Sequence, residues 1–179
     1  MTAAGIIWSI LLDPIIGLIP HWVREIGIGN FQFLHDPGMA MPLVVFVTIW
    51  KTFGLNMLIF VAGLLSLPKD YYEAADLDGA TKFQQFKSIT LPLISSTLGF
   101  CVITGIIGAF MVFDQTYIMT GGGPLFRTET MAQYIYTRGF NSPFRLGYAS
   151  ALAQGLFIII AVITLIMYKY FIKNEGEQG

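Results

Sequence analysis

The sequence has little charge and almost no cysteine or histidine. Only 12% of its 179 residues are charged, against about 25% in an average soluble domain. The single cysteine, Cys101, excludes an internal disulfide and any metal site built from several cysteines. The two histidines, His21 and His35, lie far from it in the sequence, which leaves no Cys/His nucleophile or zinc constellation. With a formal net charge of −1, the chain also lacks the basic field that nucleic acid would require.

Apolar residues are abundant, and they gather in three long runs. They make up 55% of the chain, and the mean hydropathy is +0.67. A helix that crosses a bilayer needs about 20 apolar residues at a rise of about 1.5 Å each. Three runs meet that length, at 40–67, 93–113 and 146–168. We therefore predict an all-α, multi-pass membrane protein with a transmembrane helix in each run.

The start of the sequence is apolar but too short to cross a membrane. Residues 3–12 would form about 15 Å of helix, half the thickness of the hydrocarbon layer. Asp13-Pro14 then ends them, and no Lys or Arg precedes Arg24, so the positive region of a signal peptide is missing. We interpret 1–12 as the outer end of a transmembrane helix whose beginning is absent from this sequence.

A charged, helix-forming segment, 68–92, separates the first two runs, and we call it the elbow. Pro68 suits the first turn of a helix, where its missing N–H is not needed. Good helix formers follow from Lys69 to Asp78, and Gly79 suits the left-handed cap that would end this helix. The sequence therefore predicts a short helix that stops at Gly79.

A second short helix is predicted after the glycine. Thr81 and Gln84 have the spacing of a capping box, which predicts a helix from Lys82 to about Ser88. Phe83 and Phe86 would project from one side of it as a small apolar knob. The alternative is an amphipathic hairpin that lies on the lipid headgroups.

The elbow also contains a family motif. EAA, three residues, G, nine residues, I, one residue and LP are found at 73–75, 79, 89 and 91–92. At every fixed position this pattern resembles the cytoplasmic loop of permease subunits of ATP-binding-cassette (ABC) importers. The resemblance implies a coupling helix that inserts into a cleft on the ATPase subunit, with Glu73 as the exposed carboxylate and Gly79 as the bend. We predict that the residues of ATPase coupling are Glu73, Ala74, Ala75, Gly79, Phe83, Phe86, Leu91 and Pro92.

The resemblance also decides the orientation of the chain. If the elbow is cytoplasmic, its side carries five lysines, and the opposite side carries four arginines. This difference is too small for the positive-inside rule to decide. The family likeness places 68–92 and the tail 169–179 in the cytoplasm, and the loops 13–39 and 114–145 outside.

Two further stretches resemble one branch of the family. FDQTYIMTGGGP (113–124) and RLGYASALAQ (145–154) resemble carbohydrate-uptake permeases of the maltose and glycerol-phosphate type, and the likeness covers nearly the whole chain. Such permeases have six or more membrane helices. The resemblance therefore implies the C-terminal portion of a type I ABC importer permease core, truncated at its N-terminus. Importers of amino acids, phosphate or glycerol phosphate remain alternatives.

The first run carries a polar stripe. Thr48, Lys51, Thr52 and Asn56 fall on one face of a helix. Hydroxyl, ammonium and amide groups in a row suit the hydroxyls of a sugar. The alternative is a polar contact between helices, with the Lys51 side chain extended toward the outer surface.

The resemblance adds candidate substrate-contacting positions in the first and second runs. In the second run the small, apolar residues depart from the amide-rich maltose permease, which argues against a copied maltose site. Together the predicted substrate-pathway residues are Thr48, Lys51, Thr52, Leu55, Asn56, Gly108, Ala109 and Val112.

The segment after the second run has two further features. Asp114, Gln115 and Tyr117 are candidates for a gate or for contact with a binding protein, or they belong to a solvated loop anchored by the tyrosine. The GGGP sequence at 121–124 is not a phosphate-binding loop, because no Lys-Ser/Thr follows it and it is expected on the outer side.

The resemblance implies a transport subunit and not an enzyme. Its implied partners are a pair of ABC ATPase subunits, a second permease subunit, an extracytoplasmic solute-binding protein and the lipid bilayer. We expect no cofactor on this chain, since ATP and Mg would be used by the ATPase. The implied location is the bacterial or archaeal cell (inner) membrane, and the implied mechanism is alternating access. A secondary transporter or channel, and a truncated chain that does not transport, are the rival interpretations.

Overall fold

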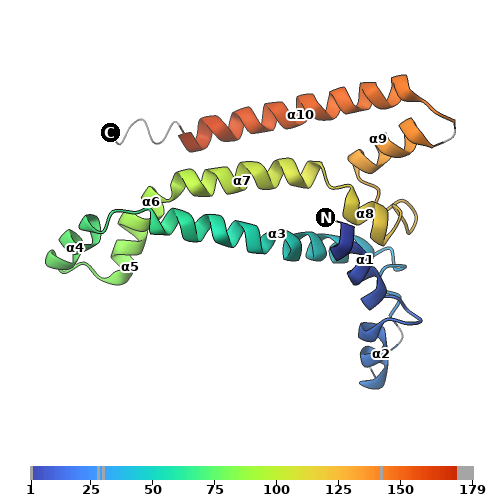
Figure 1. Ribbon diagram of the computed structural model, residues 1–179, viewed down its shortest axis with the longest axis horizontal. Coiled ribbons are helices and arrows are strands. Elements are labelled where there is room, and N and C mark those ends of the chain that lie inside the picture. Colours follow the sequence, from blue (N-terminus) through green and yellow to red (C-terminus); the bar gives the residue numbers. More distant parts are fainter. Residues whose placement is uncertain (1, 28, 30, 142, 173–179) are drawn as a thin grey trace. The chain divides into compact units, whose positions relative to one another are not determined.

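The computed structural model describes residues 2–27, 29, 31–141 and 143–172, and this part is built from helices without a strand (Figure 1). The all-α prediction is confirmed. The chain divides into two units that we describe separately: unit 1 contains 1–52 and 108–159, and unit 2 contains 53–107 and the chain from 160. The elements are α1 Thr2–Leu11, α2 Leu18–Glu25, α3 Ala40–Leu65, α4 Asp70–Leu77, α5 Lys82–Gln85, the π-helix η1 Phe86–Thr90, α6 Leu91–Leu93, α7 Ser95–Phe110, α8 Asp114–Met119, α9 Met131–Phe140 and α10 Leu146–Ile172.

Two helices are long and apolar enough to cross a membrane by themselves. They are α3, with 26 residues, and Leu146–Lys169 within α10, with 24. The second predicted run is different: α7 has 16 residues, or about 24 Å, and it follows the helical stretch Lys82–Leu93 at a bend of 60°. The bend lies at Ile94, two residues after Pro92, whose ring nitrogen has no hydrogen to donate.

Helices also occur where we predicted loops. Segment 13–39 contains α2, and segment 114–145 contains α8 and α9. The α9 helix begins at an N-cap, where the Thr130 hydroxyl accepts a hydrogen bond from the Gln133 amide. These helices have 6 to 10 residues, so a search for membrane-spanning runs does not find them. The predicted tail at 169–179 begins inside α10, and its residues 173–179 lie outside the described residues.

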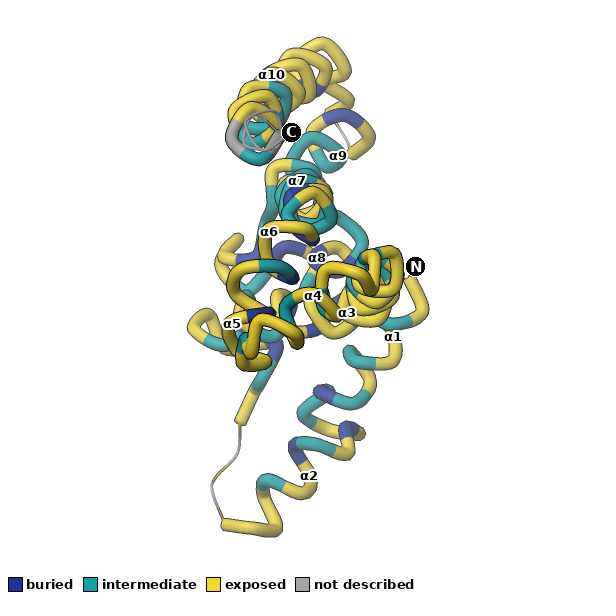
Figure 2. The backbone as a smooth tube through the Cα atoms, turned by 90° about the vertical axis from the view of Figure 1, so that its left-hand side faces the viewer, coloured by how far each residue is buried: buried dark blue, intermediate teal, exposed yellow. Residues whose placement is uncertain are grey.

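Unit 1 contains an apolar core. Its buried members are Leu12, Leu34, Val44, Val47 and Met119. The α1 helix packs on α8, and the close approach is made at a glycine: a Cβ on Gly5 would lie 3.5 Å from the side chain of Ile118. Trp8 of α1 meets Phe46 of α3 edge-on at 5.5 Å. The buried segments of α8 are visible in Figure 2.

Unit 2 has few buried side chains, and its helices approach one another at glycines. A Cβ on Gly63 would lie 2.8 Å from the Thr97 hydroxyl, and one on Gly99 would lie 2.9 Å from Phe171. In membranes, small residues at such positions allow helix backbones to pack closely. Gly105 of α7 makes no such approach, because nothing lies within 4 Å of a Cβ placed on it.

Candidate functional site

The bend of the elbow is set by Gly79. Its φ is +73°, in the left-handed region that glycine adopts without cost. The Gly79 amide donates to the Asp76 carbonyl at 3.2 Å, and the Ala80 amide donates to the Ala75 carbonyl at 2.9 Å. This is the hydrogen-bond pattern of a Schellman cap. The predicted glycine-capped end of the first short helix is confirmed.

The second short helix starts at the predicted capping box. The Thr81 hydroxyl accepts from the Gln84 amide, and the Gln84 side-chain oxygen accepts from the Thr81 amide at 2.8 Å. The predicted end near Ser88 is wrong. The helix continues through η1 and α6 as one stretch, Lys82–Leu93, because the Leu91 amide reaches back five residues to the Phe86 carbonyl. We call this stretch the second arm of the elbow, and α4 the first arm.

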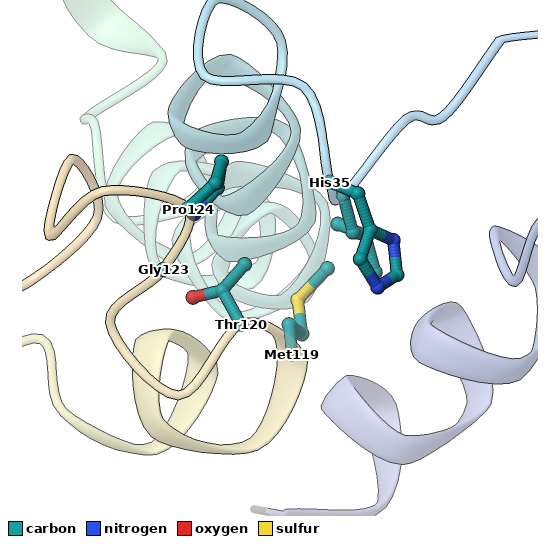
Figure 3. Close-up of a pocket in the computed structure, with 6 residues that line it drawn as sticks. His35, Met119, Thr120, Gly123 and Pro124 are labelled. Carbon is teal, nitrogen blue, oxygen red and sulfur yellow. The ribbon is translucent and has the colours of Figure 1, made fainter.

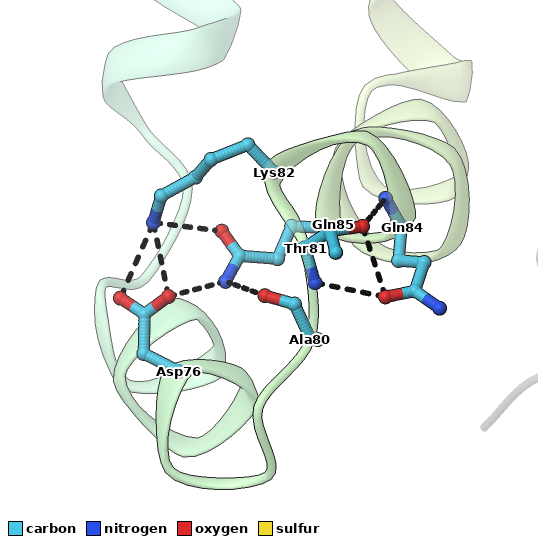
Figure 4. A network of polar contacts seen from close by, with 6 residues as sticks. All are labelled: Asp76, Ala80, Thr81, Lys82, Gln84 and Gln85. Carbon is cyan, nitrogen blue, oxygen red and sulfur yellow. Dashed lines mark hydrogen bonds and ion pairs between the residues drawn. The ribbon is translucent and has the colours of Figure 1, made fainter.

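A polar network joins the two arms (Figure 4). The Asp76 carboxylate accepts from Gln85 Nε2 at 2.5 Å and from Lys82 Nζ at 2.9 Å. Gln85 also donates to the Ala80 carbonyl at 3.3 Å, and its oxygen accepts from Lys82 at 3.1 Å. These donors, with Lys82 first and Gln85 second, hold the pKa of the Asp76 carboxyl below its usual value. The sequence analysis missed Asp76 and Gln85, since spacing along the chain does not reveal a contact between two helices.

The side chains of the predicted coupling residues take no part in this network. Glu73 and Ala74 are exposed, Ala75 is half-buried, and the Glu73 carboxylate has no hydrogen-bond or ion-pair partner among the described residues. The Phe83 and Phe86 side chains are 74% and 50% exposed. Leu77, which the sequence analysis missed, is 90% exposed at the end of α4. The predicted coupling residues Leu91 and Pro92 at the far end of the second arm are exposed as well.

The polar stripe of α3 is present, with its hydroxyl groups already bonded. Thr48 donates to the Val44 carbonyl at 2.8 Å, and Thr52 donates to the Thr48 carbonyl at 3.0 Å. Their oxygens therefore remain available only as acceptors. Lys51 and Asn56 are half-buried, and neither side chain has a hydrogen-bond or ion-pair partner in the described part of the chain.

The predicted pathway residues are divided between the two units. Thr48, Lys51 and Thr52 lie in unit 1, whereas the exposed Leu55 and the half-buried Asn56 lie in unit 2. Of the second set, the exposed Gly108 and Ala109 and the half-buried Val112 lie in unit 1. No hydrogen bond or ion pair joins the two sets within the described residues. Their role in a pathway stays a prediction.

One small hollow lies elsewhere in unit 1 (Figure 3). Its volume is about 170 Å³, and its lining residues are Leu34, His35, Met119, Thr120, Gly123 and Pro124. None of them is a predicted pathway residue. Sites for small molecules usually measure about 300 to 1,000 Å³, so this hollow is too small to enclose a disaccharide.

The GGGP segment forms a turn held by threonines. Thr128 donates to the Gly123 carbonyl at 2.7 Å, and the Thr120 and Thr128 hydroxyls are 2.6 Å apart. Of the three gate or contact candidates in α8, Gln115 is buried, Asp114 is half-buried and Tyr117 is exposed. Because Gln115 is buried, its side-chain amide is not available to a partner at the surface.

Comparison with known proteins gives the family. Residues 4–174 match the family described as the binding-protein-dependent transport system inner membrane component. The chain is 34% identical to the probable ABC transporter permease protein YurN of Bacillus subtilis over 179 residues, which are 99% of this chain and 61% of that protein. It is 35% identical to the sn-glycerol-3-phosphate transport system permease protein UgpA of Agrobacterium fabrum, over 98% of this chain and 59% of UgpA. A putative ABC transporter permease of Caldicellulosiruptor is 40% identical over 80% of this chain and 100% of its own length.

Two solved structures have a similar fold. A bacterial ABC transporter involved in the import of the acidic polysaccharide alginate superimposes with a TM-score of 0.84 at 24% identity, over 96% of this chain and 60% of that one. The alginate transporter in complex with its pentasaccharide-bound periplasmic protein gives 0.70 at 26% identity, over 93% and 56%. The chain thus spans about three fifths of YurN, UgpA and the solved permeases. It belongs to the family of binding-protein-dependent transport system inner membrane components, the multi-pass membrane permeases of ABC transporters.

Proposed function

We propose that this chain is a permease subunit of an ABC importer and forms part of the transmembrane pathway for a sugar or sugar-like solute. The observation that carries the proposal is the elbow. Its bend is fixed by Gly79, and it presents an unpartnered carboxylate together with exposed apolar side chains at Leu77, Phe83 and Phe86. Exposed apolar anchors that enter a groove provide affinity, and a nearby charge provides register.

The proposed partners follow from the same surface and from the relatives. In this proposal the elbow lies in the cytoplasm and binds an ATPase subunit of a pair, which uses ATP and Mg. A second permease completes the pathway, and an extracytoplasmic binding protein delivers the solute. The alginate transporter, for comparison, was solved in complex with a pentasaccharide-bound periplasmic protein. ATP-driven movement of the elbow would rock the membrane helices between inward-open and outward-open states.

Lys51 favours an anionic solute within this class. It is the one charged residue of α3 and α7. A lysine near the middle of a membrane helix costs about 2.5–3.5 kcal/mol on insertion scales, and an anion beside it would offset that cost. UgpA is named for sn-glycerol-3-phosphate, and the alginate importer for an acidic polysaccharide. A phosphorylated or carboxylated sugar derivative is therefore the second candidate, beside a neutral sugar.

The test compares variants of the elbow in the importer assembled with its ATPase, second permease and binding protein. Glu73→Ala removes the exposed carboxylate, and Gly79→Pro forbids the positive φ. Both should uncouple solute-stimulated ATP hydrolysis from uptake into liposomes. Asp70→Ala is the matched control, since it removes an exposed carboxylate from the first turn of the same helix.

Wild-type coupling in both elbow variants would reject the coupling role. A purified complex that takes up solute without any bound ATPase would instead identify a secondary transporter or channel.

A further inference from the structure

The two arms of the elbow are tied together by side chains at two places. Asp76 of the first arm accepts from Gln85 Nε2 and from the more exposed Lys82 Nζ, and the Tyr72 hydroxyl lies 2.9 Å from the Thr90 hydroxyl. On the second arm Gln85 and Thr90 are 3% and 9% exposed, although most of the elbow is exposed. We call these contacts the outer tie (Asp76–Gln85) and the inner tie (Tyr72–Thr90). The inner tie lies two residues before Pro92, where the second arm leads into α7.

The π-helix explains how both ties form on one face. Tyr72 and Asp76 are four residues apart, so they share a face of α4. Gln85 and Thr90 are five residues apart, and five residues of regular α-helix would turn their side chains about 140° away from each other. A π turn bonds residues five apart and brings them into line. The Thr90 hydroxyl accordingly lies 3.5 Å from the Gln85 carbonyl, and both side chains point to the first arm.

We propose that the two ties make α4 and the second arm one rigid body, and that the inner tie carries the movement of α4 directly to the start of α7. This inference rests on the proposed coupling function. The covalent route between the arms passes through Gly79, where nothing lies within 4 Å of the Cβ position, so this turn is held by the backbone hydrogen bonds of its cap without side-chain packing. Without the ties, α4 would swing about this turn and the displacement would be lost there. Tyr72 and Thr90 are thus positioning residues for transport.

The structure offers closely matched variants. Tyr72→Phe removes only the hydroxyl of the inner tie, and Tyr71→Phe removes a hydroxyl from the neighbouring tyrosine, which is exposed. Thr90→Val breaks the same tie, and Thr90→Ser keeps a hydroxyl there. Gln85→Met breaks the outer tie and keeps a side chain of similar length.

The first measurement is the amount of solute taken up per ATP hydrolysed by the assembled importer in liposomes. The double variant Tyr72→Phe/Gln85→Met should lower this ratio about tenfold, as the loss of two partly buried hydrogen bonds would. Thr90→Val should lower it less, and Thr90→Ser should restore it. Tyr71→Phe should leave it unchanged, and the amount of ATPase bound should stay constant in every variant. An unchanged ratio in the double variant, or an equal loss in Tyr71→Phe, would overturn the proposal.

A second measurement decides the rigid-body claim without reference to transport. With Cys101→Ser as background, spin labels at Asp70→Cys and Lys87→Cys report the distance between the arms by pulsed electron resonance in the same complex. The double variant should broaden a narrow distance distribution, and an unchanged distribution would refute rigidity by the ties. If Glu73→Ala and Gly79→Pro also leave coupling intact, the proposed function fails and the transmission claim fails with it, while the labels still decide the rigidity.

Discussion

At the scale of single residues, Gly79 shows a requirement that comes from the backbone alone. Its φ is positive and its Cβ position is open, so a side chain there would meet no neighbouring atom. Gly79→Ala should destabilise the elbow by about 1 kcal/mol, because a left-handed conformation costs an L-residue that much. Gly79→Asn should cost less, since asparagine tolerates this region. Hydrogen exchange of the amides at 78–81 in the assembled importer measures both effects, and equal protection in the two variants would contradict this explanation.

Asp76 makes the elbow sensitive to acid. Hydrogen bonds from Lys82 and Gln85 lower the pKa of its carboxyl in the folded state below the ordinary 3.8. A lowered folded-state pKa gives a contribution to stability that is complete above the ordinary value and is lost as the pH falls through the folded value. Hydrogen-exchange protection of the turn between α4 and α5 should therefore fall in that acidic window. Asp76→Asn should remove this step and Asp70→Asn should retain it, and a step that persists in Asp76→Asn would assign it to another group.

In the proposed importer, Lys51 is expected to give the substrate pathway its preference for anionic solutes. Lys51→Met should raise the apparent KM of the importer for an anionic solute about tenfold or more, as loss of a hydrogen bond to a charged group would. Uptake of a neutral sugar should be unchanged, and Lys51→Arg should retain most of the affinity for the anion. Uptake at several solute concentrations measures this. Equal kinetics for the anion in the wild type and Lys51→Met would leave Lys51 outside the pathway.

At the scale of elements, the glycine contacts of unit 2 separate two kinds of small residue on α7. A methyl group on Gly99 would meet Phe171 at 2.9 Å, whereas one on Gly105 would meet nothing within 4 Å. Gly99→Ala should destabilise the isolated chain in detergent by about 1–3 kcal/mol through overpacking. Gly105→Ala should be neutral there. Melting temperatures of the two purified variants test this, and an equal loss in both would mean that the packing of α7 differs from the structure.

The elbow also shows what a sequence can predict about an element. The Gly79 cap and the Thr81–Gln84 capping box depend on residues within one turn of each other, so their spacing was enough. The π-helix was not predicted, because its side chains are held by partners on α4 rather than by neighbours along the chain. The length of the second run was overestimated for a related reason: hydropathy continues past Phe110, and only the backbone shows that α7 ends there.

At the scale of the whole molecule, the apolar helices have little cover inside this chain. Within the most apolar windows of α3 and α10, 11% and 0% of the residues are buried. In the proposed importer, lipid and a second permease would supply most of their contacts. The predicted pathway residues could not be grouped from the sequence, because spacing along one chain does not show which residues of different helices or subunits meet. The long apolar helices α3 and α10 were predictable, because apolar length is a property of the sequence itself.

The same exposure predicts that the chain is unstable alone. We expect the purified chain in detergent to aggregate on heating well below the melting temperature of the complex with its second permease and ATPase. The reason is that its small-residue faces and apolar helices find packing partners only there. Comparing thermal aggregation of the two preparations by size-exclusion chromatography tests this. Equal thermal stability would show that the contacts within the chain suffice.

The exposed side chains at Leu77, Phe83 and Phe86 also affect the life of the chain before assembly. Exposure of large apolar side chains to water is energetically unfavourable, and such side chains bind other exposed apolar surfaces. If an ATPase covers them in the proposed importer, they would expose an unassembled subunit to chaperones and quality-control proteases until that ATPase binds. In this way the surface that would transmit force in the finished importer would also limit how many unpaired permeases a cell accumulates.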